Sequence, residues 1–155
     1  MPFQISALAG EQFEHLFAMS QEQLAATQVI ERTANEENSF PCRVSLEDAK
    51  IGEQLLLVNF EHLPVNSPYR SRHAIYVRRG ARTAHPAENE IPGMLRSRTL
   101  SVRGFDPDGI MLEAEICPGN ELEHAIQTSF ANPAVNYLHV HFAGPGCYAA
   151  RIDRA

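Results

Sequence analysis

Lysine is nearly absent from this sequence: the 13 basic residues comprise one lysine, Lys50, and twelve arginines. A high-GC genome would produce that bias without a functional cause, but its chemical consequence is the same. Almost every cation carries a planar guanidinium that can form paired hydrogen bonds to a carboxylate or a phosphate. The 19 acidic residues outnumber the basic ones, and the formal net charge is −6. That balance argues against nucleic acid or an anionic membrane as a partner attracted by bulk charge.

Long apolar runs and a cysteine framework are missing as well. No stretch of about 18 apolar residues occurs, so no membrane-spanning helix is predicted. The first residues lack a basic region followed by an apolar one, so no secretory signal is expected. The three cysteines, Cys42, Cys117 and Cys147, are too few and too scattered for a disulfide scaffold. An odd number of thiols without an export signal predicts a cytoplasmic protein.

The composition that remains is typical of a globular protein with a core. At 155 residues, 44% hydrophobic and 21% charged, the chain is predicted to form a single domain over residues 1–155. Capping-box patterns at Ser20 and Asn120 mark the starts of two helices. Helices are expected near residues 11–19, 21–27 and 121–131, with a brief one at 45–49. Strands are expected near residues 3–8, 29–34, 52–62, 72–79, 95–105, 110–116, 137–142 and 147–153, and a mobile surface segment at 82–92.

These elements predict an α+β fold with a mainly antiparallel sheet of about five to seven strands. The helices that begin at Glu11 and Asn120 are expected to pack mostly on one face of that sheet. Four consecutive apolar residues, Leu55 to Val58, predict that the strand at 52–62 is central and buried on both faces. The apolar stripe of the helix at 121–131 should cover the apolar face of the C-terminal hairpin.

That C-terminal hairpin, residues 136–154, carries the densest set of reactive side chains. A three-residue loop at Gly144–Gly146 would pair Phe142 with Tyr148 and Ala143 with Cys147. Because strand side chains alternate between faces, one face of the hairpin becomes wholly apolar. The opposite face then collects Tyr137, His139, His141, Cys147, Arg151 and Asp153, with His139 opposite Arg151 and Tyr137 opposite Asp153.

The two histidines of this hairpin have three interpretations. They are ordinary residues on a solvated sheet face, or they form a metal site, since His-x-His on a strand puts both rings on one side. In the third, His139 and His141 face Arg151 in a pocket that recognises an anion. A fixed cation raises the cost of binding a metal, so anion recognition ranks above metal binding, and no metal ligand or cofactor is assigned.

Two further segments carry candidate site residues. Cys42 stands beside Arg43 and before the predicted helix at 45–49, and both features favour a reactive thiolate. The alternative is that Cys42 is a small buried hydrophobic residue. The loop before the strand at 72–79 brings together Arg70, Arg72 and His73, which form either part of a site or a solvated turn.

Three motifs resemble a known family. Phe40–Ala49, Ser67–Arg70 and His139–Arg154 are similar to signatures of the family named domain of unknown function 1203, over nearly the whole chain. The resemblance implies a bacterial, single-domain protein. It brings no activity, cofactor or catalytic assignment.

Our first hypothesis is therefore an enzyme that acts on a small anionic metabolite. His139 or His141 would be the general acid or base, and Cys42 or Cys147 a possible nucleophile. The residues expected to bind the substrate are Arg151, Tyr137, Arg43, Arg70, Arg72 and His73. The alternatives are a non-catalytic ligand-binding or protein-interaction domain and, second, a His-x-His metal site. An enclosed pocket with displaced histidine pKa values would favour the enzyme over a flat interaction surface.

Overall fold

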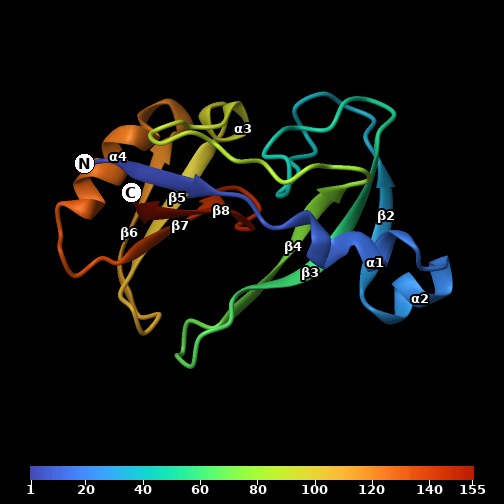
Figure 1. The fold of residues 1–155 in the computed structure, drawn as a ribbon, viewed down its shortest axis with the longest axis horizontal. Helices are drawn as coiled ribbons and strands as arrows, with labels where there is room; N and C mark the ends of the chain where they lie inside the picture. The colour runs from blue at the N-terminus through green and yellow to red at the C-terminus, as the bar shows by residue number, and fades with distance from the viewer.

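Two antiparallel sheets organise the chain in the computed structural model, which describes residues 1–155 (Figure 1). The larger sheet has the strand order β1 (Phe3–Ser6), β8 (Tyr148–Arg154), β7 (Tyr137–Phe142), β5 (Thr99–Phe105) and β6 (Met111–Pro118). The smaller sheet has the order β2 (Val29–Thr33), β3 (Gln54–Leu63) and β4 (Ser71–Arg78). The predicted α+β class is confirmed, but the eight strands form two sheets rather than the single sheet of about five to seven strands that was predicted.

The helices are divided between the sheets in the same way (Figure 1). The α4 helix (Leu122–Phe130) packs on β5 and β6, whereas α1 (Glu14–Phe17) and α2 (Gln21–Ala26) lie with the smaller sheet. A third helix, α3 (Gly93–Arg96), and two 3-10 turns, η1 (Gly10–Phe13) and η2 (Gly119–Glu121), complete the set. None of these helices has the length and apolar character needed to span a bilayer.

Each sheet has its own apolar core. The buried stripe of α4, including Leu122, Ile126 and Phe130, shares a core cluster with Leu138 and Val140 of β7. This packing confirms the predicted cover of the hairpin's apolar face. The second cluster joins Leu16 and Leu24 of the N-terminal helices to the smaller sheet, where β3 is the central strand as predicted.

Local signals explain some element boundaries and miss others. The capping box of Ser20 and Gln23 forms at the start of α2. The predicted helix at 45–49 is wrong: a turn and a bend lead to Asp48, which forms an isolated bridge with Pro41. Leu46 has φ +55°, a left-handed conformation that does not continue a helix. The segment at 82–92 runs along the larger sheet, where Asn89 exchanges hydrogen bonds with Phe3 of β1.

Candidate functional site

The two histidines of β7 are buried between the sheets. His139 is 2% exposed and His141 is fully buried, as are the remaining residues of β7. The interpretation of these histidines as ordinary residues on a solvated face is therefore wrong. One face of β7 packs on the core under α4, and the other meets side chains of the smaller sheet.

The β7–β8 register follows the prediction at the far end of the hairpin and departs from it near the turn. His139 pairs with Arg151 and Tyr137 with Asp153, as predicted. The register then shifts after Val140, so that His141 lies opposite Tyr148, and Phe142 donates to the carbonyl of Cys147 across a four-residue loop. The predicted pairs of Phe142 with Tyr148 and of Ala143 with Cys147 are wrong. The extra residue is Ala149, and its insertion turns Tyr148 onto the histidine face.

Two more histidines come from the smaller sheet. A register shift between Glu61 and Leu63 leaves His62 as the extra residue of a bulge at the end of β3. Bulges redirect side chains, and this one places the His62 ring between His73 of β4 and Tyr148 of β8. The His62 ring is stacked on both, with centroid distances of 4.7 Å to His73 and 5.0 Å to Tyr148.

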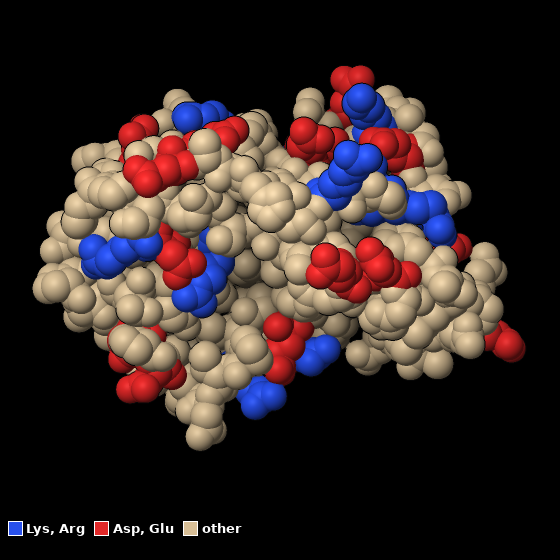
Figure 2. All heavy atoms as spheres, in the orientation of Figure 1, with Lys and Arg blue, Asp and Glu red and all other residues tan.

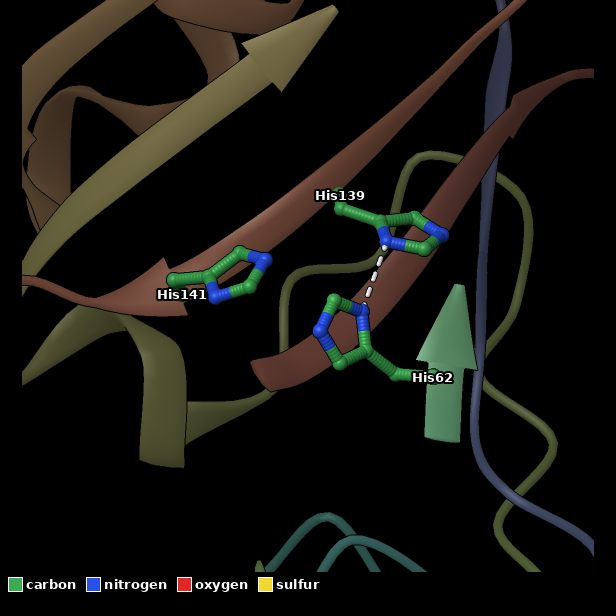
Figure 3. Close-up of side chains that lie close together, drawn as sticks. All are labelled: His62, His139 and His141. Carbon is green, nitrogen blue, oxygen red and sulfur yellow. Dashed lines mark hydrogen bonds between the residues drawn. The ribbon is translucent and has the colours of Figure 1, made fainter. Parts of the chain in front are cut away.

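His62, His139 and His141 form a cluster that we call the three-histidine centre (Figure 3). One nitrogen of each ring lies within 4.8 Å of the others. The Nδ1 atoms of His62 and His139 are 3.4 Å apart. Two ligands of a tetrahedral zinc ion, each about 2.05 Å from the metal, are separated by about 3.4 Å. The separation of these two nitrogens therefore already equals that of two ligands of one zinc ion.

His141 is held in the form that a metal ligand needs. Its Nδ1 atom lies 2.9 Å from the carbonyl oxygen of Gly146. A carbonyl only accepts hydrogen bonds, so Nδ1 carries the proton and Nε2 carries a lone pair. That Nε2 atom is buried and has no hydrogen-bonding partner. Metal-binding histidines are oriented in this way, with one nitrogen donating to a carbonyl and the other free for the ion.

His62 has a comparable supporting contact. Its Nε2 atom lies 2.8 Å from Nδ1 of His73, on the opposite side of the ring from His139. Each contact between two imidazoles needs one protonated and one unprotonated nitrogen. When Nδ1 of His62 is a ligand, its Nε2 proton is donated to His73, so His73 orients the ring.

Burial keeps these rings neutral. It is the largest cause that lowers the pKa of His62 to about 4, of His139 to about 3 and of His141 to about 2, and it also lowers the pKa of His73. The positive charge of Arg103 contributes to all four shifts. Neutral imidazole is the form that binds metals, whereas a general acid or base works best with a pKa near the working pH.

The predicted anion-binding arginines are engaged by protein partners. Arg151 lies above the ring of Tyr137 and forms an ion pair of 2.7 Å with Asp153. Arg70 and Arg72 are exposed and pair with Glu61 at 3.1 Å and 3.6 Å. Arg43, 1% exposed, donates to the carbonyls of Pro41 and Tyr148 and to the sulfur of Cys147.

The two cysteines differ in access. Cys42 is fully buried in the core of the smaller sheet, and its sulfur accepts from the backbone N–H of Arg78. This is the environment of a small hydrophobic residue, which was the alternative interpretation. Cys147 is half-buried and lines a cavity of about 620 Å³. That cavity is bordered by Arg43, His73, Tyr76, Arg98, Phe142 and Cys147.

The structure thus brings His73, His139, His141 and Arg43 to one place and adds three residues that the sequence analysis missed. These are His62, Arg103 and Tyr148. The alternation pattern gave no signal for His62 or Tyr148, because each depends on a bulge. Arg103 could have been found from the strand at 95–105, had its pairing with His139 been foreseeable.

Comparison with known proteins gives a family and nothing further. The family described as "Protein of unknown function (DUF1203)" matches residues 39–154, which include all four clustered histidines. No curated protein and no solved structure matches the chain.

Proposed function

The chain belongs to the DUF1203 family, and we propose that it is a metalloenzyme in which His62, His139 and His141 bind a divalent transition-metal ion such as Zn²⁺. The observation that carries this proposal is the buried, unpartnered Nε2 lone pair of His141. An unsatisfied buried polar atom costs about 1–3 kcal/mol, and a metal ion would satisfy it.

Three neutral imidazoles are the ligand set of a catalytic rather than a structural site. Structural zinc is usually held by four protein ligands, whereas catalytic zinc keeps one position for water or substrate. In this arrangement His62, His139 and His141 supply three ligands, and His73 and Gly146 hold two of them in place. A metal ion held there would lower the pKa of bound water toward neutrality and polarise a substrate oxygen.

Enclosure supports an enzyme over a flat interaction surface. The centre lies between two sheets, its histidine pKa values are displaced from their ordinary values, and His73 also borders the cavity of about 620 Å³. A small molecule, and an anion in particular, suits such a site. Acidic and basic side chains are interspersed on the face drawn in Figure 2, which gives nucleic acid no basic surface to follow there.

The proposed setting is a bacterial cytoplasm. All three cysteines are free, which suits a reducing compartment.

The first test is the metal content of untagged protein purified without chelators and measured by inorganic mass spectrometry. We expect a near-stoichiometric divalent metal in the wild type and its loss in His141→Ala. His124→Ala, which removes an exposed imidazole from α4, is the matched control and should keep the metal. Equal metal content in the His141 variant and the wild type would refute the proposal.

A second measurement tests for the open coordination position. Protein reloaded with Co²⁺ should show the absorption of a low-coordinate site, and added imidazole should change that spectrum by occupying the fourth position. If added imidazole did not change the Co²⁺ absorption spectrum, the site would be a closed structural one, and the enzymatic part of the proposal would fail.

A further inference from the structure

The smaller sheet covers only part of the face that bears the histidines. His139 pairs across β5 with Arg103, and His141 pairs with Ser101. Side chains of directly opposed residues lie on the same face of a sheet, so Arg103 and Ser101 border the three-histidine centre. Both are only half-buried, whereas the histidines beside them are buried. The face therefore opens toward solvent at β5.

Arg103 differs from the other arginines near the centre. Its Nε atom donates to Oγ of Ser101 at 3.2 Å, and its two terminal nitrogens have no protein partner. Arg151, on the other side of His139, is paired with Asp153, and Arg43 donates hydrogen bonds to backbone carbonyls. Two free donors on a planar guanidinium suit a carboxylate or a phosphate group.

A metal ion next to Arg103 would leave an excess of positive charge at the site. Three neutral histidines leave the charge of a divalent ion uncompensated, and the Arg103 charge adds to it. Because opposite charges stabilise one another, an anion bound between the ion and Arg103 would strengthen the binding of the metal. The fixed cation, which by itself disfavours the metal, thus becomes part of the site once an anion is present.

An exposed apolar stripe continues the same face beyond β5. On the edge strand β6, Ala114 lies opposite Arg103 and Ile116 lies opposite Ser101. Ile116 is 71% exposed, and Leu112 nearby is also exposed. Edge strands are commonly protected by charged residues, yet the charged Glu113 and Glu115 alternate with this stripe and lie on the other face.

We propose that this open half of the sheet is the substrate subsite, where Arg103 binds the anionic group of a small organic acid and Ala114 and Ile116 support its apolar part. The inference rests on the proposed function, because the anionic group would reach the metal of the three-histidine centre. It names the substrate class as an anion with an apolar body. It also replaces Arg151, Arg70 and Arg72 as anion-binding residues with Arg103.

The test uses full-length protein loaded with Co²⁺ and titrated with acetate, hexanoate and the neutral hexanamide, with the metal absorption as readout. Each of the four additional methylenes of hexanoate would contribute about 0.8 kcal/mol, or about fourfold in affinity, if it were fully buried. Because the stripe is open and covers the chain only in part, hexanoate should bind roughly tenfold more tightly than acetate. Hexanamide should bind more weakly than hexanoate by about tenfold or more, because it cannot form charge-assisted hydrogen bonds.

Variants separate the two parts of the subsite. Arg103→Gln should weaken the binding of both carboxylates by about 10- to 100-fold. Arg82→Gln, which removes an exposed arginine outside the three-histidine centre, should bind them as the wild type does. Ile116→Ser should reduce the preference for hexanoate over acetate and leave acetate binding unchanged. Circular dichroism of each variant verifies that the fold is retained.

The outcomes distinguish the two proposals. Failure to bind Co²⁺ would overturn the metal centre and this inference with it. Normal Co²⁺ binding with the same hexanoate affinity in Arg103→Gln and wild type would overturn the inference alone. Normal Co²⁺ binding without any hexanoate binding would do the same.

Discussion

The carbonyl oxygen of Gly146 lies 2.9 Å from Nδ1 of His141 and thereby decides which nitrogen of that ring is free. Gly146 has φ +79°, a left-handed conformation that glycine adopts without strain. The turn of the C-terminal hairpin would thus support the proposed metal centre as well as connect β7 and β8.

Gly146→Ala should destabilise the protein by about 1 kcal/mol, because an L side chain disfavours positive φ. Any shift of the carbonyl should also weaken metal binding by about tenfold or more, as is usual when a supporting contact of a ligand is lost. Urea unfolding and a competitive zinc titration measure the two effects. Gly144→Ala is the control, since that glycine has no positive φ and its added Cβ would contact nothing within 4 Å. Equal effects of both substitutions would contradict this role of Gly146.

The stability of the metal-free protein should fall as the pH falls below about 6.5, the ordinary pKa of histidine. The folded state keeps His139 and His141 neutral, with pKa values of about 3 and about 2, so below pH 6.5 only the unfolded chain takes up their protons. Stability is therefore present above that pH and is lost on acidification, by about 2 kcal/mol per histidine between pH 7 and pH 5.

Urea unfolding at pH 7 and pH 5 tests this dependence. His141→Gln should make the loss smaller than in the wild type, and His124→Gln, at an exposed position of α4, is the matched control. If the wild type were as stable at pH 5 as at pH 7, the histidines could not be buried in neutral form.

Thiol alkylation of the native protein should label Cys147 and spare Cys42. Cys147 lines the cavity, whereas Cys42 is fully buried and reacts only when the smaller sheet opens. We expect at least about a tenfold difference in rate, measured by mass spectrometry of peptides after timed exposure to iodoacetamide. Faster labelling of Cys42 would restore it as a candidate nucleophile.

Arg43→Met should cost about 3 kcal/mol of stability. The guanidinium is buried and donates to the carbonyls of Pro41 and Tyr148, and its removal leaves these acceptors without a partner at about 1–3 kcal/mol each. Thermal unfolding followed by circular dichroism gives the change. Arg32→Met, at an exposed position of β2, should be nearly neutral. If Arg43→Met left the stability unchanged, the two carbonyls would have found other hydrogen-bond donors.

The sequence predicted the parts of the site that depend on strand alternation. It placed His139 opposite Arg151 and Tyr137 opposite Asp153, and these pairs hold because the additional loop residue and the Ala149 bulge offset one another. It could not place His62 or Tyr148, because a bulge adds one residue and so reverses the face on which the following side chains lie.

The sequence also could not predict how the two sheets pack against each other. Alternation along a strand indicates which face is polar but not which other element lies against it. Arg103 and His62 are neighbours of the β7 histidines through sheet order and sheet packing, and both arise only in the folded chain. The predicted anion site was consequently assigned to Arg151 of the same hairpin and to Arg70 and Arg72 of the loop before β4, which the structure shows to be paired with Asp153 and Glu61.

His62 stands at the end of β3, before the middle of the chain, whereas His139, His141 and their support Gly146 come from its last 20 residues. During synthesis the first ligand therefore leaves the ribosome long before the other two. An ion held by all three, as proposed, could be acquired only after β7 and β8 have been made and the two sheets have docked, so metal loading would mark a molecule in which this docking is complete.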